Sequence, residues 1–76
     1  MKTYQIKKIK KERETIVEGT LAYLIDYFGY ILEIGNSWNR KINRNPKTIK
    51  SFVSNLEKSY DEKEGACYER TYIELI

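Results

Sequence analysis

Histidine is absent from the 76-residue sequence, and cysteine, proline, methionine and tryptophan occur once each. Histidine is the side chain that changes charge near neutral pH and most often serves as a general base. The single cysteine, Cys67, cannot form an internal disulfide, and without histidine it cannot build a zinc site. The sequence also has no glycine-rich phosphate loop and no carboxylate pair at a spacing typical of acid–base catalysis. We therefore expect no enzymatic activity, no cofactor and no metal site.

The sequence also lacks an apolar segment long enough to cross a membrane. Its longest apolar run, Thr20–Trp38, contains Asp26 and Glu33, whereas a spanning helix needs roughly 20 consecutive apolar residues. The segment Met1–Arg13 is polar and basic, without the apolar stretch of a signal peptide. A single cysteine fits a reducing compartment. We therefore expect a cytoplasmic protein that does not act at a membrane.

The run Thr20–Trp38 has the apolar spacing of a buried helix face, which predicts one helix from Leu21 to Ile34. The residues on this face are Leu21, Leu24, Ile25, Phe28, Ile31 and Leu32. Thr20 is a candidate N-cap, and Gly35 followed by Asn36 is a candidate stop. The alternative is a pair of strands broken at Gly29-Tyr30, which the aromatic and β-branched content favours.

A second stripe of the predicted helix is aromatic and consists of Tyr23, Tyr27 and Tyr30. One interpretation is that these tyrosines cover the flank of the core. The other is that they form a partner-binding face together with Trp38, because aromatic residues dominate interface hot spots. Trp38 has an alternative structural role, in which it attaches the following loop to the core together with Ile42.

The flanking segments predict strands and a second helix. Residues Thr3–Ile6 and Thr15–Val17 resemble two strands joined by a hairpin tip at Lys10–Arg13, and Tyr68–Ile76 resembles a third strand. Apolar content of 41% suffices for one small domain covering residues 1–76. We expect an α+β fold of order ββααβ, in which two helices pack on one face of a three-stranded antiparallel sheet.

The second helix is predicted to start at Asn45-Pro46, since asparagine is a favoured N-cap and proline fits the first helical position. It should run to about Lys63 and stop at Gly65. Its buried face is expected to hold Ile49, Phe52, Val53, Leu56 and Tyr60. Its outward face is expected to hold Lys47, Lys50, Ser51, Ser54 and Asn55.

The net charge of +3 is unevenly distributed, because two segments are strongly basic. Their candidate contacts to nucleic acid or to an acidic partner are Lys7, Lys8, Lys10, Lys11, Arg13, Arg40, Lys41, Arg44, Lys47 and Lys50. Binding of this kind would be largely insensitive to base sequence and would weaken steeply with salt. The alternative is that these residues are solvated or protect a sheet edge from aggregation. A helix-turn-helix is disfavoured, because the gap from Gly35 to Asn45 is longer than its usual turn.

The segment from Gly19 to Ser51 resembles short accessory proteins carried by phages and mobile elements of Gram-positive bacteria. The resemblance rests on GTL, LIDYF, YILEIG, SW and INRNPKTIKS within that segment. It implies a non-enzymatic inhibitor or modulator in a bacterial host, one that binds a host protein or ribonucleoprotein complex such as a CRISPR effector. Anti-CRISPR proteins that imitate DNA are acidic, and this basic chain differs from them. A homodimer is compatible with the resemblance, and a small basic DNA- or RNA-binding accessory protein is the alternative.

Overall fold

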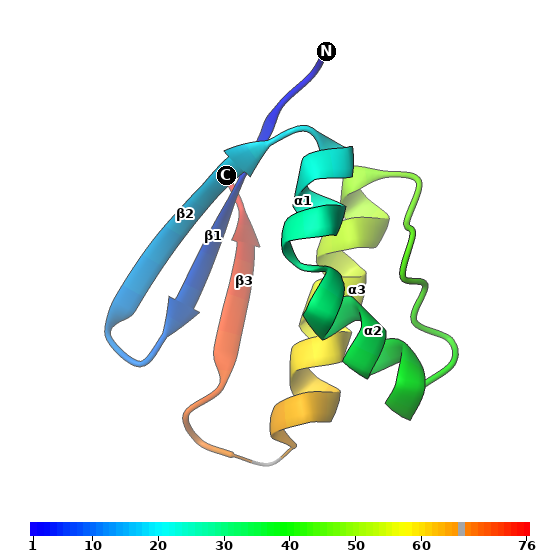
Figure 1. The fold of residues 1–76 in the computed structure, drawn as a ribbon. Coiled ribbons are helices and arrows are strands. Elements are labelled where there is room, and N and C mark those ends of the chain that lie inside the picture. The colour runs from blue at the N-terminus through cyan, green and yellow to red at the C-terminus, as the bar shows by residue number, and fades with distance from the viewer. Residues whose placement is uncertain (66) are drawn as a thin grey trace.

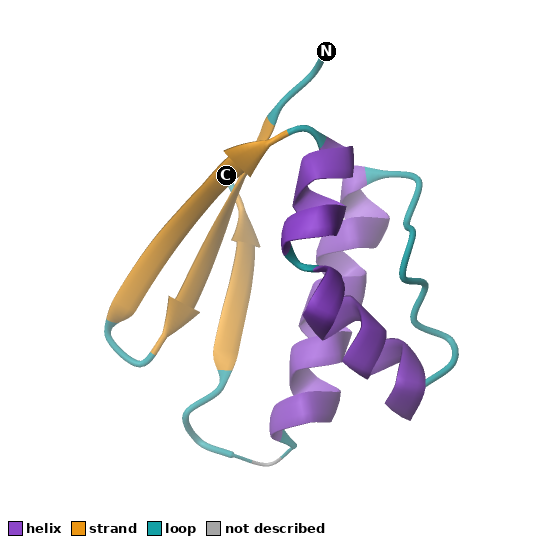
Figure 2. Cartoon of the chain, viewed as in Figure 1, coloured by secondary structure: helices purple, strands orange, loops and turns teal. Residues whose placement is uncertain are grey.

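The computed structural model describes residues 1–65 and 67–76 as a helical layer packed on one side of an antiparallel sheet (Figures 1 and 2). The elements in chain order are β1 (Tyr4–Lys10), β2 (Arg13–Gly19), α1 (Leu21–Tyr27), α2 (Gly29–Trp38), α3 (Ile49–Glu64) and β3 (Thr71–Leu75). This arrangement confirms the predicted α+β fold with a three-stranded antiparallel sheet. The described residues form three helices, because the central run contains two.

The sheet has the strand order β2-β1-β3, and both of its pairings are antiparallel. Ile6 of β1 lies opposite Val17 in β2 and Leu75 in β3. The hairpin is longer than predicted, and Lys11 at its tip has a positive φ of 57°. The third strand pairs with the hairpin as expected, although it begins at Thr71 rather than at Tyr68.

Side-chain alternation along the strands gives the sheet two different faces. Ile6, Val17 and Ile73 point toward the helices and belong to the core. The outer face carries Ile16 and Tyr72, whose side chains are 57% and 61% exposed. Because no helix of the described residues covers the outer face, these apolar groups stay in contact with solvent (Figure 2).

The central run is helical, so the alternative of two strands is wrong, but the single helix predicted from Leu21 to Ile34 is interrupted. Phe28 leaves helical geometry with φ −96° and ψ 12°, and the next residue, Gly29, begins α2. The bend follows from the low helix propensity of glycine. It allows Leu24 and Leu32, on opposite sides of the bend, to be fully buried in one core.

Gly35 is the second correction in this run, since it lies inside α2 rather than at its end. It is buried against α3, and a Cβ on residue 35 would fall 2.8 Å from the Cα of Ser59. Glycine at this position therefore permits close helix packing instead of a left-handed stop. The helix continues through residues that were predicted to be loop and ends at Trp38.

The third helix begins three residues later than predicted, with Thr48 as its N-cap. The Thr48 hydroxyl accepts a hydrogen bond from the backbone N–H of Ser51 at 3.1 Å. Asn55 was predicted to face outward, but it is buried, and its Nδ2 donates to the Asn43 carbonyl at 2.9 Å. Burial of this amide follows from its role in binding the preceding loop. The predicted stop at Gly65 is confirmed as the C-cap of α3.

Candidate functional site

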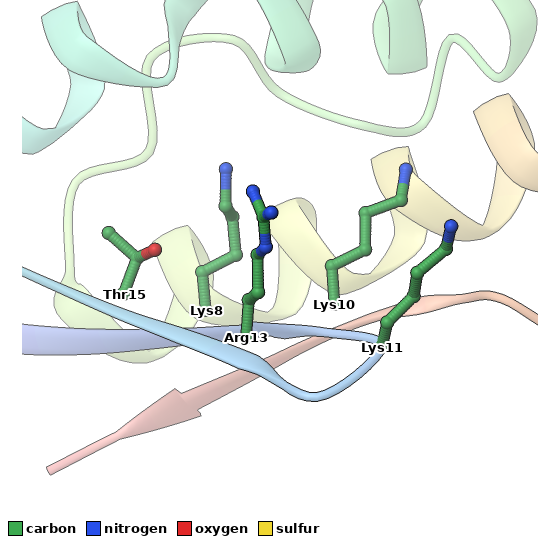
Figure 3. A pocket seen from close by; sticks show the side chains of 5 residues that line it. All are labelled: Lys8, Lys10, Lys11, Arg13 and Thr15. Atoms are coloured by element: carbon green, nitrogen blue, oxygen red, sulfur yellow. The ribbon is translucent and has the colours of Figure 1, made fainter.

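The hairpin gathers basic side chains on the helix side of the sheet. Cross-strand register places Lys8 opposite Thr15 and Lys10 opposite Arg13, and alternation points all four to the same side. Figure 3 shows these side chains, with that of Lys11 from the tip, standing on one side of the hairpin. The five residues line an open hollow of about 530 Å³, which we call the basic hollow. The fold thus concentrates four of the predicted cations in one place.

Carboxylates neutralise only part of this charge. Lys10 Nζ lies 3.2 Å from Glu64 Oε2, and Lys11 Nζ lies 3.4 Å from Glu69 Oε2. Among the described residues, Lys8 and Arg13 take part in no ion pair. These two side chains are therefore available to an external anion.

Glu64 connects the basic hollow to the last turn of α3. Its side chain is only 9% exposed, and its Oε1 accepts a hydrogen bond from the backbone N–H of Thr71 at 2.8 Å. Burial alone raises the pKa of Glu64, but the Thr71 N–H and the Lys10 ammonium outweigh it, so the pKa is lowered overall. Glu64 is therefore an anion at neutral pH and holds Lys10 at one end of the hollow.

The helical layer carries several tyrosine rings. Tyr60, one turn earlier on α3, is partly buried, and its pKa is raised first by burial and then by the charges of Glu64 and Tyr27. The rings of Tyr23 and Tyr27 lie 6.2 Å apart, and the Lys63 ammonium lies 5.9 Å from the ring centre of Tyr30. We call Tyr23, Tyr27, Tyr30 and Tyr60 the tyrosine patch. This patch and the basic hollow meet at the last turn of α3, because Lys63 lies beside the Tyr30 ring and the next residue, Glu64, contacts Lys10.

The predicted aromatic residues have different positions. Tyr23, Tyr27 and Tyr30 are exposed by 50%, 53% and 72%, so each of them is only partly covered by the core. Trp38 is 73% exposed at the opposite end of α2 from Tyr30, so the expectation that it attaches the loop to the core is wrong. Ile42 of the same loop is fully buried, and the Asn36 side chain donates a hydrogen bond to its carbonyl.

The remaining predicted cations lie away from the basic hollow. Lys7 points to the outer face of the sheet, where its Nζ is 3.5 Å from Glu14. The second basic segment lies in the α2–α3 loop and the start of α3, across the helical layer from the hairpin (Figure 1). Its exposed members are Arg40, Lys41, Arg44, Lys47 and Lys50. One of them, Arg44, lies 3.9 Å from Glu33. The two basic segments therefore do not form one continuous surface.

Sequence reasoning missed Thr15, Tyr60, Lys63 and Glu64 as members of this region. Strand alternation could have assigned Lys7 to the opposite face of the sheet from Lys8 and Lys10 once the hairpin register was known. The contact between Lys10 and Glu64 joins residues far apart in sequence, and no local pattern predicts it. Cys67 is exposed.

Within the described residues, no group of three or more acidic or cysteine side chains gathers as metal ligands would. No described helix is both long and apolar enough to cross a membrane. Comparison of the chain with protein-family models, with curated proteins and with solved structures found no match.

Proposed function

We propose that the chain is a non-enzymatic binding protein whose basic hollow receives the phosphate backbone of a nucleic acid, free or within a nucleoprotein. The observation that carries this proposal is the pair Lys8 and Arg13, which share the hollow with two further cations and form no ion pair among the described residues. Uncompensated cations facing one hollow raise the local concentration of polyanions. Release of counterions from the nucleic acid then favours binding.

The chemistry of the lining residues suits phosphate. Arginine offers a planar fork of donors that matches phosphate oxygens, and lysine supplies a compact charge on a flexible chain. The Thr15 hydroxyl adds a neutral donor on the same side. Phosphate contacts position a protein on a nucleic acid without reading its sequence. We therefore expect binding with little base preference.

The test is fluorescence anisotropy with labelled oligonucleotides over a range of salt concentrations. In the variant Lys8→Ala/Arg13→Ala, two phosphate contacts are lost. The slope of log affinity against log salt on a single strand should therefore fall by about 1.4, at about 0.7 per contact. The matched control is Arg40→Ala/Lys41→Ala, which removes the same charge from the exposed α2–α3 loop.

Retention of the wild-type slope by the control supports the hollow as the binding site. Equal losses in both variants would mean that net charge alone drives binding, which contradicts the proposal. Absence of any binding at low salt would also contradict it. Circular dichroism and thermal melting of each variant confirm that the fold is intact.

A second candidate function, protein binding through the tyrosine patch, is favoured by the exposure of Tyr27 and Tyr30. It corresponds to the phage-type inhibitor or modulator of a host protein that the sequence resemblance implies. Its test is a pull-down from bacterial lysate treated with nuclease. A single stoichiometric partner that is retained by wild type and lost in Tyr27→Ala/Tyr30→Ala would favour this function over nucleic-acid binding.

A further inference from the structure

We treat the basic hollow and the tyrosine patch as the sheet wall and the helix wall of one site, because Lys63, 5.9 Å from the Tyr30 ring centre, precedes Glu64, which contacts Lys10. The sheet wall carries the unpaired cations Lys8 and Arg13. The helix wall carries exposed phenol rings beyond Glu64, which lies 3.2 Å from Lys10. A ligand that follows both walls must combine negative charge with flat apolar groups.

We infer that the ligand of this site is a single-stranded nucleic acid, with phosphates on the basic hollow and unpaired bases against Tyr27 and Tyr30. This inference rests on the proposed function and specifies the ligand of the same site. Single-strand binding sites generally combine a positive groove that follows the backbone with aromatic rings on which bases stack. Both components are present here on adjacent elements.

Exposure of the rings distinguishes a single strand from a duplex. The side chains of Tyr27 and Tyr30 are 53% and 72% exposed, so ring surface is available to a base. In a duplex, the faces of the bases are covered by their neighbours, whereas a single strand can turn them outward. The Lys63 ammonium, 5.9 Å from the Tyr30 ring centre, adds positive charge beside that ring. A strand passing Tyr30 therefore has a cation near its backbone.

The experiment compares a labelled oligothymidine with a duplex of the same length. In Tyr27→Ala/Tyr30→Ala, affinity for the single strand should fall at least about thirtyfold, because two stacked bases are lost at about fivefold or more each, while duplex affinity stays at the wild-type value. The conservative variant Tyr27→Phe/Tyr30→Phe keeps the rings and should keep single-strand affinity. The matched aromatic control is Trp38→Ala, which removes an equally exposed ring at the other end of α2.

A second measurement uses the wild-type chain and does not depend on the variants folding. Stacked bases shift the ring-proton resonances of nearby tyrosines, so NMR should show upfield shifts for Tyr27 and Tyr30 with the single strand and none with the duplex. Absence of these shifts on a saturated complex would overturn the inference.

The failure of the inference is distinguishable from the failure of the proposed function. Equal affinity for single strand and duplex, unchanged by Tyr27→Ala/Tyr30→Ala, would refute base stacking and leave phosphate binding at the hollow intact. A loss in Trp38→Ala as large as that in the tyrosine variant would also refute it. If neither nucleic acid binds at low salt, both the inference and the proposed function are wrong.

Discussion

Gly35 of α2 lies so close to Ser59 of α3 that a Cβ atom on residue 35 would fall 2.6 Å from the Ser59 Cβ. The Ser59 hydroxyl meanwhile donates to the Asn55 carbonyl at 2.7 Å, and Ser59 is fully buried. The contact thus fixes the distance between α2 and α3, each of which contributes two residues to the core. A side chain at position 35 would therefore push the two helices apart.

Gly35→Ala should therefore lower the free energy of unfolding by about 1–3 kcal/mol, the usual effect of overpacking. The control is Gly29→Ala at the start of α2, where an added Cβ meets nothing within 4 Å. That change should be neutral or stabilise by up to about 1 kcal/mol, since alanine favours a helix. Urea denaturation of both variants provides the measurement. Equal stability of the two would contradict the close contact.

Ile42→Ala should destabilise the chain by about 2–5 kcal/mol, because Ile42 is fully buried and its truncation leaves a cavity. Ile16→Ala, on the open outer face with 57% exposure, should change stability by at most about 0.5 kcal/mol. Thermal melting followed by circular dichroism compares them. A small effect at Ile42 would mean that the α2–α3 loop does not depend on this side chain.

Stability should decrease at acidic pH in a way that depends on Glu64. Its folded pKa lies below the ordinary value of 4.5, so its ionised form contributes stability above that value. That contribution is lost as pH falls through the folded pKa. Glu64→Gln should cost about 1 kcal/mol near neutral pH and flatten the acidic decline, since amides do not titrate. The exposed Glu57→Gln variant on the same helix should keep the wild-type decline, and urea melts at several pH values test both.

Trp38 is the only tryptophan and is 73% exposed, so its fluorescence reports on one surface position. Iodide should quench it nearly as well as it quenches a free tryptophan derivative. Saturation with an oligonucleotide at the basic hollow should leave its emission unchanged, because Trp38 lies at the far end of α2 from Tyr30. A strong spectral shift on binding would place the ligand elsewhere.

Much of the fold could be predicted, because local periodicity determined it. The hairpin, the helical nature of residues 21–34 and the buried face of α3 follow from spacing that a strand or helix requires. The predictions that were wrong concern residues whose type suits two different structural roles. Glycine at 35 suits both a helix stop and a close helix contact, and only the position of Ser59 decides between them.

The prediction of where α3 begins was wrong for a related reason. Asn45-Pro46 and Thr48 are each good N-terminal signals, and local chemistry ranks them almost equally. Pro46 is buried instead, and the loop before Thr48 is fixed by the amide of Asn55 binding the Asn43 carbonyl. That contact spans twelve positions, which no local pattern detects.

The sequence was enough to predict which residues of the candidate site are charged, but not how they are arranged in space. The sequence indicated two basic segments and left open whether three tyrosines cover the core or face a partner, and the structure leaves these tyrosines at least half exposed. Which cations lie on the helix side of the sheet depends on strand register, and their position next to α3 depends on the contact of Lys10 with Glu64. Both are tertiary properties that composition does not determine.

The two faces of the hairpin differ in charge because odd and even positions of each strand point to opposite faces. Even positions of β1 place Lys8 and Lys10 on the helix side, whereas even positions of β2 place Glu14 and Glu18 on the open side. One extra residue between Ile6 and Lys8 would move both lysines to the open side without altering composition or isoelectric point. Related chains should therefore be compared by odd and even position along this hairpin, because a count of lysines would not reveal whether the site survives.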